Sequence, residues 1–318
     1  MRKVSYSECN MAKPTPNAKD YIRPLNMNGL QGRMIRMPAP KSRSREILMV
    51  YGHHSSLERW FGLIQVFNKY GAVTMPDLPG FGGMDSFYRI GQKPTLDNMA
   101  DYLASFIKLR YKRRRVTIVG MSFGFVIATR MLQRFPDLAK RVDLLISLVG
   151  FAHKDDFVDK PASYWSYRVV SAVFSKPIAS HFFRTVCLHP LVLRWVYTKL
   201  DHAKFRGLTP EQDEQMLEVE ISLWRDNDVR THMYTMGSML KLDNCGKRVD
   251  LPVWHVATKN DHWLNNQNVE QHLRIIFTDY ESSSIDLTKH APTVIADAKD
   301  AEPFVPPKLR KRLASKDA

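Results

Sequence analysis

Ser122 is the residue of this chain best placed to do chemistry, because it stands in the stretch Gly-Met-Ser-Phe-Gly at positions 120–124. Val116–Val119, just before, is short, β-branched and apolar, which is typical of a buried strand. Residues 126–135 repeat apolar side chains at helical spacing and stop at Pro136. A serine between strand and helix, with Gly120 and Gly124 on either side, predicts a nucleophile elbow.

The pattern of two glycines around a serine is not decisive alone. It should arise by chance in about one chain in ten of this length. A serine hydroxyl is also a poor nucleophile until an imidazole takes its proton, and the imidazole needs a carboxylate to orient it. The prediction therefore depends on an acid and a base elsewhere in the chain.

A candidate acid and a candidate base follow two later strand patterns. Residues 251–257 are apolar and β-rich, and they lead to Asp261. Residues 284–288 alternate as a short strand does, and they lead to His290, in a loop before a predicted helix. The chain order Ser122, Asp261, His290 is that of the α/β hydrolases and differs from the orders of the two main serine protease folds.

Other titratable residues have alternative interpretations. Asp155 and Asp156 follow the predicted sixth strand and are the alternative candidates for the acid. We favour Asp261 because it ends a strand of its own, the more common arrangement. Asp77 is interpreted as a turn residue, and His255, inside a strand, as a core residue.

A third loop suggests where a developing negative charge would be held. The strand at 46–50 opens into Tyr51-Gly52-His53-His54. A glycine at such a strand end lets a backbone N–H from this loop join the N–H of Phe123 in an oxyanion hole.

On these residues the chain resembles the α/β-hydrolase superfamily over about residues 45–300. Asp-Leu-Pro-Gly-Phe-Gly at 77–82, the stretch 120–124 and Lys-His-Ala-Pro-Thr-Val at 289–294 stand at the family's places. The resemblance implies Ser122 as nucleophile and carries the second oxyanion donor onto His53. Tyr51 and His54 depart from the family's His-Gly-x-Gly. A serine nucleophile points away from the epoxide hydrolase and dehalogenase branches.

The expected fold is a mostly parallel twisted sheet flanked by helices, with a helical cap inserted after the sixth strand. Asn28-Gly29 predicts a hairpin within 22–37, and residues 57–70 and 96–111 are helical patterns between the early strands. Between about 151 and 249 the strand–helix alternation gives way to helical patterns rich in aromatic residues. The predicted organisation is a flexible segment (1–20), an α/β-hydrolase core (21–150 and 250–300), the cap (151–249) and a basic C-terminal tail (301–318).

Charge and composition limit the classes of binding partner that we expect. The 318 residues include 47 Lys and Arg against 32 Asp and Glu, a formal charge of +15, which attracts anions. No nucleic-acid-binding signature accompanies the basic runs, so we expect no nucleic-acid partner. Basic charge beside apolar residues at 182–197 suggests, as a hypothesis, peripheral contact with an anionic membrane.

The remaining features suggest a cytoplasmic protein. Residues 1–6 lack the apolar core of a secretory signal, and no run of eighteen apolar residues predicts a membrane span. Cys9, Cys187 and Cys245 are far apart and form no zinc or disulfide pattern. We expect no metal and no cofactor.

The expected activity is that of a serine hydrolase with an acyl-enzyme intermediate, acting on small or medium apolar carboxylic esters. The same triad would also serve a C–C bond hydrolase or a cofactor-free perhydrolase. A third hypothesis is a homologue that binds a small ligand without turnover. The oligomeric state is left open.

Overall fold

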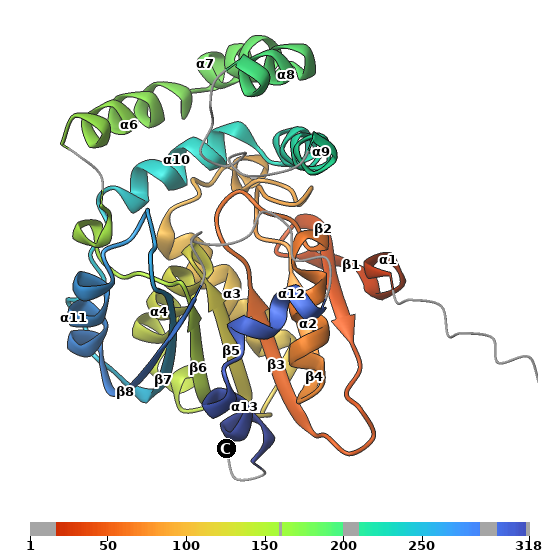
Figure 1. Cartoon of the computed structure of the whole chain (residues 1–318), viewed down its shortest axis with the longest axis vertical. Helices are drawn as coiled ribbons and strands as arrows, with labels where there is room; N and C mark the ends of the chain where they lie inside the picture. The colour runs from red at the N-terminus through yellow and green to blue at the C-terminus, as the bar shows by residue number, and fades with distance from the viewer. Residues whose placement is uncertain (1–16, 159–160, 200–209, 287–297, 316–318) are drawn as a thin grey trace, which may run out of the picture.

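An eight-stranded sheet forms the centre of the protein (Figure 1). The computed structural model describes residues 17–158, 161–199, 210–286 and 298–315. The strands run in the order β1-β2-β4-β3-β5-β6-β7-β8. Their bounds are β1 Ile22–Met27, β2 Leu30–Met37, β3 Arg45–Val50, β4 Gly71–Pro76, β5 Val116–Met121, β6 Val142–Leu148, β7 Val249–Thr258 and β8 Phe277–Ile285.

The sheet begins with an antiparallel hairpin and continues as parallel strands. β1 pairs with β2 and β2 with β4 in antiparallel register, whereas every pairing from β4 across to β8 is parallel. Asn28 and Gly29 turn the hairpin with φ of 54° and 80°, the left-handed conformation that a two-residue hairpin turn requires. The predicted fold class is confirmed.

Helices of the core connect the parallel strands. Thr95 caps the longest of them by accepting a hydrogen bond from the amide of Asn98 at 3.1 Å. That helix begins and ends where the sequence predicts. The core helices are α1 Ala18–Tyr21, α2 Phe61–Asn68, α3 Leu96–Tyr111, α4 Phe123–Arg134, α5 Pro136–Ala139, α11 Asn266–Ile276, α12 Ala298–Ala301 and α13 Pro307–Ala314.

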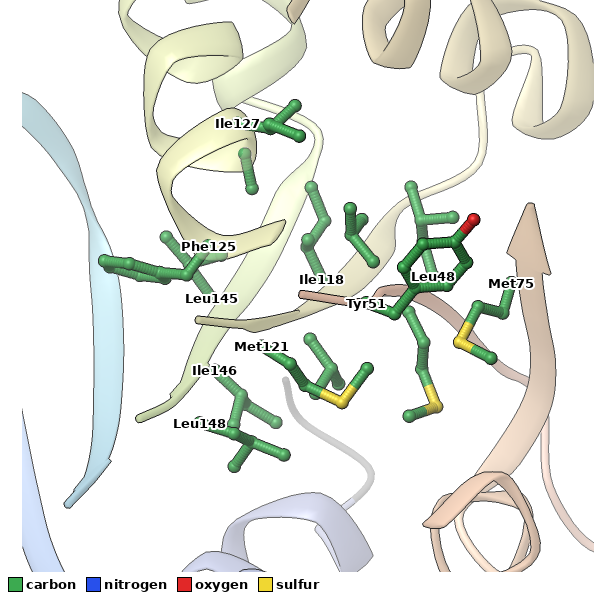
Figure 2. Close-up of a cluster of buried hydrophobic side chains, with 14 of the residues drawn as sticks. Leu48, Tyr51, Met75, Ile118, Met121, Phe125, Ile127, Leu145, Ile146 and Leu148 are labelled. Carbon is green, nitrogen blue, oxygen red and sulfur yellow. The ribbon is translucent and has the colours of Figure 1, made fainter. Parts of the chain in front are cut away.

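One apolar core runs between the sheet and these helices. Figure 2 shows side chains of β3, β5 and β6 meeting those of α4, among them Leu48, Ile118, Phe125 and Ile146. All four are fully buried. Strands buried on both faces need continuous apolar runs rather than alternation, which is why the strands at 46–50 and 116–119 could be identified from sequence.

The insertion after β6 is helical and forms two layers. Its helices are α6 Pro161–Phe174, α7 Pro177–Phe182, α8 Pro190–Lys199, α9 Pro210–Asp226 and α10 Val229–Met239. In Figure 1, α9 and α10 lie over the sheet, and α6–α8 form an outer layer above them. α6 packs on α10, and α8 on α9.

The last strand differs from the prediction. β8 covers residues 277–285, seven residues earlier than the predicted start at 284, and the end of the predicted strand, 287–288, lies outside the described residues. β8 is an edge strand in which only Phe277 and Ile285 are buried. Its intervening polar residues removed the apolar signal on which the prediction relied.

The basic C-terminal segment contains a helix packed on the core. Leu309 and Leu313 of α13 are buried. Arg43 and Arg45 donate hydrogen bonds to the carbonyls of Ala314 and Ser315, at 3.0 and 3.2 Å. Cations at the carboxyl end of a helix satisfy carbonyls that have no intrahelical donor.

The start of α4 lies unusually close to the strands beside it. A Cβ on Gly124 would be 2.2 Å from the carbonyl oxygen of Val50 and 2.4 Å from that of Tyr51. A Cβ on Gly120 would be 2.5 Å from the Cα of Phe125. Backbone atoms block both positions, so neither glycine can be replaced without moving the helix away from the sheet.

We expect Gly124→Ala to lower the free energy of unfolding by at least about 2 kcal/mol, because the added methyl group collides with backbone that cannot rotate away. Urea denaturation followed by circular dichroism measures this. Gly246→Ala is the matched control, since no atom lies within 4 Å of its added Cβ. We expect the control to change stability by less than about 0.5 kcal/mol. Equal stability of the two variants would contradict the analysis.

Candidate active site

Ser122 occupies a strained turn between β5 and α4. Its backbone has φ 48° and ψ −118°, a region that non-glycine residues rarely adopt and that costs about 1–3 kcal/mol. The strain is held in place by hydrogen bonds. The Ser122 amide donates to the carbonyl of Leu148 at 2.9 Å, and the Ser122 carbonyl accepts from the amide of Phe125 at 3.0 Å. The geometry is that of a nucleophile elbow.

The first turn of α4 and the loop after β3 lie beside Ser122. Phe123 is the first residue of α4, so its N–H has no acceptor within the helix and lies at the positive end of the helix dipole. Gly52 faces the serine from the loop after β3. A Cβ on Gly52 would be 3.2 Å from the Cβ of Ser122 and 3.8 Å from its Oγ. This close approach brings the loop carrying His53 alongside Ser122.

The loops of the predicted acid and base leave neighbouring strand ends. Thr258 of β7 pairs with Ile285 of β8, and the amide of Lys259 donates to the Ile285 carbonyl at 3.0 Å. Asp261 follows the end of β7 by three residues. His290 lies outside the described residues, so its role stays a prediction.

Asp261 is partly exposed at the carboxyl end of β7. Its Oδ1 accepts hydrogen bonds from the amides of Trp263 and Leu264 at 2.8 and 3.1 Å. Its Oδ2 accepts from the hydroxyl of Thr258 at 3.2 Å. These three hydrogen bonds fix the orientation of the carboxylate.

The alternative acids have different surroundings. Asp156 is fully buried, and its Oδ2 accepts from the amides of Ala152 and His153 at 2.8 and 2.9 Å. Its Oδ1 lies 2.5 Å from Nδ1 of His272 on α11. Asp155 is exposed and lies 3.4 Å from the imidazole of His153. Asp156 thus ties the start of the cap to α11.

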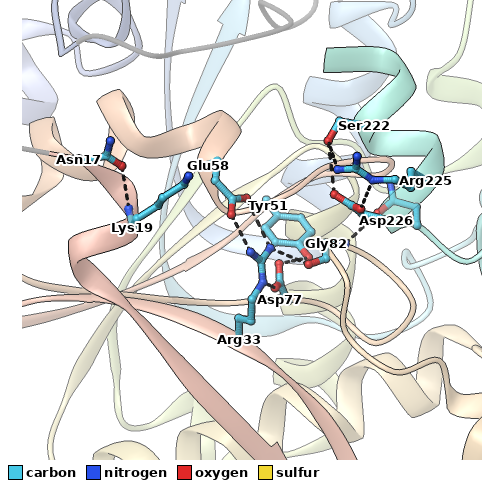
Figure 3. Close-up of polar contacts among 11 residues, drawn as sticks. Asn17, Lys19, Arg33, Tyr51, Glu58, Asp77, Gly82, Ser222, Arg225 and Asp226 are labelled. Carbon is cyan, nitrogen blue, oxygen red and sulfur yellow. Dashed lines mark hydrogen bonds and ion pairs between the residues drawn. The ribbon is translucent and has the colours of Figure 1, made fainter. Parts of the chain in front are cut away.

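A polar network centred on the buried residues Tyr51 and Asp77, which sequence analysis missed, links the loops after β3 and β4 (Figure 3). The hydroxyl of Tyr51 donates to Oδ1 of Asp77 at 3.0 Å and accepts from the amide of Leu78 at 2.7 Å. Arg33 reaches Asp77 at 3.1 Å and Glu58 at 2.7 Å. Tyr51 stands where the family has a histidine, and its hydroxyl links the loop after β3 to the loop after β4.

Asp77 is therefore more than a turn residue. Burial raises the pKa of its carboxyl well above the usual value, and the Arg33 guanidinium opposes the shift. Burial also raises the pKa of Tyr51, with a further contribution from Asp77. The sequence gives no sign of this pairing, because the two side chains are 26 positions apart.

His53 is connected to the cap through its side chain. Its Nε2 lies 3.2 Å from the carbonyl of His232 and 2.9 Å from Oγ1 of Thr235, both on α10. Because a carbonyl only accepts, Nε2 carries the proton. Desolvation, helped by nearby His54, lowers the pKa of His53 to about 3. The imidazole is neutral near pH 7 and anchors the loop whose backbone lies next to Ser122.

Asn227, at the junction of α9 and α10, is a second residue that sequence analysis missed. Its Oδ1 accepts from the amide of Gly82 at 2.7 Å, and its Nδ2 lies 3.1 Å from Nδ1 of His54. Gly82 N–H is only a donor, so the Asn227 oxygen must face it and the Asn227 nitrogen must face His54. Nδ1 of His54 consequently accepts. One carboxamide joins the cap to both loops.

Neighbouring contacts hold the same junction on the core. The amide of Gly83 donates to the carbonyl of Asp226 at 3.1 Å, and the amide of Asp228 donates to that of Gly80 at 2.8 Å. The guanidinium of Arg230 lies 3.6 Å from the ring centre of Tyr88. This inner part of the cap is firmly attached beside the site.

A cavity of about 780 Å³ lies between α6, α10 and the core. Asp97, Arg130, Trp165, Tyr234 and Lys241 are among its lining residues, and Ser122 is not. Within the part of the chain that the structure describes, no three His, Cys, Asp or Glu side chains gather as a metal site.

The comparison with protein families agrees with this geometry. A family model described as the alpha/beta hydrolase fold matches residues 47–233. The chain belongs to the α/β-hydrolase fold family. The match includes the loop after β3, the elbow and much of the cap. A search of curated proteins found no significant match.

Solved structures show the same fold over nearly the whole chain. A thermophilic esterase from Thermogutta terrifontis has a TM-score of 0.62 and 15% identity, covering 92% of this chain and 98% of its own. An esterase from Exiguobacterium antarcticum has 0.64 and 15%, covering 91% and 97%. An epoxide hydrolase has 0.64 and 14%, covering 92% and 96%. At these identities the likeness concerns the fold alone.

We expect Asn227→Asp to destabilise the protein by about 1–3 kcal/mol at pH 8, because the variant places an oxygen against the unprotonated Nδ1 of His54. Urea denaturation of both proteins at pH 8 measures this. Equal stability of the two proteins would contradict the assigned carboxamide orientation.

His255 provides a test of stability against pH. It is buried, its Nδ1 lies 2.8 Å from Oγ of Ser147, and desolvation lowers its pKa to about 4 while Asp261 opposes the shift. The unfolded chain takes up this proton near pH 6.5 and the folded chain does not. Stability is thus fully present above pH 6.5 and is lost as the pH falls toward 4, by up to about 1.4 kcal/mol per pH unit.

The matched variant is His255→Gln, which keeps a polar group beside Ser147 and cannot titrate. The difference in unfolding free energy between wild type and variant, measured from pH 7.5 to 4.5, should change with that slope. Parallel curves over the whole range would show that folding does not lower the pKa of His255.

Proposed function

We propose that this protein is a serine hydrolase in which Ser122, His290 and Asp261 form the catalytic triad. The strained backbone of Ser122 is the observation that carries the proposal. Strain of this kind persists only where surrounding structure enforces it, and it is concentrated at functional sites. The family match, which shows the fold, supports the same assignment.

The surroundings of the three candidate acids favour Asp261 over Asp156 and Asp155. Asp261 is partly exposed and held by two amides at the end of β7, beside the strand that leads toward His290. Asp156 is fully buried and already bonded to His272 and two amides. Its role in this proposal is to anchor the cap to α11.

The mechanism is a two-step acyl transfer. Ser122 Oγ forms a bond to the ester carbonyl carbon while His290 takes the hydroxyl proton. The amides of Phe123 and His53 donate to the oxyanion, and one such donor contributes about 3–4 kcal/mol. The C–O bond to the leaving alcohol then breaks, and His290 returns the proton to it. Water repeats the sequence on the acyl-enzyme and releases the acid and Ser122.

Small or medium apolar carboxylic esters are the proposed substrates. Two of the solved structures similar in fold are named esterases, and the site needs no cofactor for this reaction. Cys187 and Cys245 are free thiols, in keeping with the cytoplasmic location that we propose. Peripheral contact with an anionic membrane also remains a proposal.

Labelling with a fluorophosphonate probe tests the nucleophile directly. Wild type should be modified and Ser122→Ala should not, because the probe reacts only with an activated serine. A folded wild-type protein that takes up no label would instead favour the hypothesis of a ligand-binding protein without turnover.

Paired variants test the acid. We expect Asp261→Asn to lower kcat on a nitrophenyl ester by about 10⁴, because the imidazole loses its orienting carboxylate. Asp156→Asn should affect stability more than kcat of the folded fraction. Steady-state kinetics and circular dichroism on both variants separate the two effects, and a 10⁴-fold loss confined to Asp156→Asn would reverse the assignment.

A further inference from the structure

The outer layer of the cap exposes an unusual amount of apolar surface. Most of the large apolar side chains that are exposed among the described residues lie on three consecutive helices, α6–α8, and the π-helical turn at 183–187. Trp165 and Val169 line the cavity beneath α6. Of the rest, Ile178 is 87% exposed, Leu191 71% and Trp195 63%. The others are Tyr167, Val170, Val173, Phe182, Val186 and Val192. We call this set, without the two residues of the cavity, the outer cap face.

α6 turns a polar side chain toward the protein and apolar side chains toward solvent, the reverse of a helix that simply packs on a protein core. Ser171 is its buried residue, and it faces Gly237 of α10, where an added Cβ would meet the Ser171 Oγ at 2.9 Å. Val170 and Val173, which do not line the cavity beneath α6, are 37% and 48% exposed. Helices of soluble proteins normally turn their apolar stripe inward, so the orientation of α6 points to an apolar environment outside the protein.

The charge of this segment is equally one-sided. Residues 160–200 contain six Lys and Arg and no Asp or Glu, in a chain with 32 acidic residues. Arg194 is paired with Glu214 and Glu218 of α9. Arg168 and Lys176 are exposed and form no ion pair with the described residues. The outer cap face is therefore apolar and cationic.

We propose that the outer cap face docks the protein on an anionic lipid bilayer. Aliphatic and tryptophan side chains would enter the boundary between headgroups and acyl chains, and Lys176 and Arg168 would lie among the anionic headgroups. No helix of the described residues is long and apolar enough to cross a bilayer, and the mode proposed here is contact in the plane of the interface. α9 and α10 separate this face from the sheet (Figure 1), so docking goes beyond the proposed hydrolysis and does not depend on it.

A bilayer suits this face better than a second copy of the chain. In a symmetric dimer the same patch meets itself, which would bring the cationic residues of two acid-free segments together. An anionic surface complements them. The other basic cluster, Arg110–Arg115 at the end of α3, offers only Leu109 as a large exposed apolar side chain, and so lacks the apolar component.

Vesicle flotation of the full-length protein tests the proposal. We expect binding to vesicles of phosphatidylcholine with phosphatidylserine, weaker binding to phosphatidylcholine alone, and partial release by high salt, because the headgroup attraction is screened. Tryptophan fluorescence should shift to the blue on binding, as Trp195 leaves water.

The decisive variant is the triple substitution Ile178→Ser, Leu191→Ser and Trp195→Ser. These side chains are exposed, so folding should be unaffected, and vesicle binding should fall at least roughly tenfold. Lys176→Glu should weaken binding to the anionic vesicles alone. Leu109→Ser and Ile275→Ser are the matched controls, since both remove an exposed apolar side chain elsewhere and should bind as wild type does.

Three results would overturn the proposal. The first is no flotation of wild type with anionic vesicles. The second is binding that survives the triple substitution or is lost in Leu109→Ser. The third is a dimer, detected by analytical ultracentrifugation, that the triple substitution dissociates while vesicle binding is absent. Fluorophosphonate labelling of the same samples reports on Ser122 separately, so failure of docking and failure of catalysis are distinguishable.

Discussion

The close contact between the first turn of α4 and the ends of β3 and β5 is the constraint on which the rest of the site depends. Gly124 lies against the carbonyls of Val50 and Tyr51, and Gly120 against Phe125. With the helix pressed this near the sheet, the connecting residue has room for only a tight turn. Ser122 therefore adopts a strained backbone conformation, and the apolar contacts of the core stabilise the fold that imposes this strain.

The loops around the elbow are held by buried polar groups rather than by apolar packing alone. Tyr51 and Asp77 fasten two loops to each other, and Asn227 fastens both to the cap. A hydrogen-bond donor that is already in position stabilises a developing charge without reorganisation during the reaction. This bracing of the loop that carries Gly52 and His53 is the physical reason for proposing that its backbone contributes to an oxyanion hole.

Much of the fold could be predicted because its signals are local. The hairpin turn at Asn28-Gly29, the apolar runs of the central strands and the capped helix at 96–111 are each encoded within a few residues. Ser122 was identified in the same way, from strand, glycine and helix in direct succession. The position of β8 was missed because an exposed edge strand needs few apolar residues.

The site's supporting residues could not be predicted, because they act over long distances in the chain. Asn227 contacts Gly82 and His54, which precede it by 145 and 173 positions. No motif around either partner predicts this contact. In the sequence, Tyr51 is only a departure from the family pattern. The role of its hydroxyl follows from its hydrogen bond to Asp77, which is distant in the chain. The pairing of buried donors and acceptors is a property of the packed structure and not of any short stretch of sequence.

The attachment at 226–228 has a topological consequence for the insertion. It divides one long excursion of the chain into two shorter closed loops, one containing α6–α9 and the other containing α10. Each loop then has its own closure entropy, and lengthening one costs little in the other. The outer loop can therefore accept insertions, deletions and new helices. The shorter loop keeps the edge of the sheet beside Ser122 in place, so the outer layer can change in length while the geometry of the site is maintained.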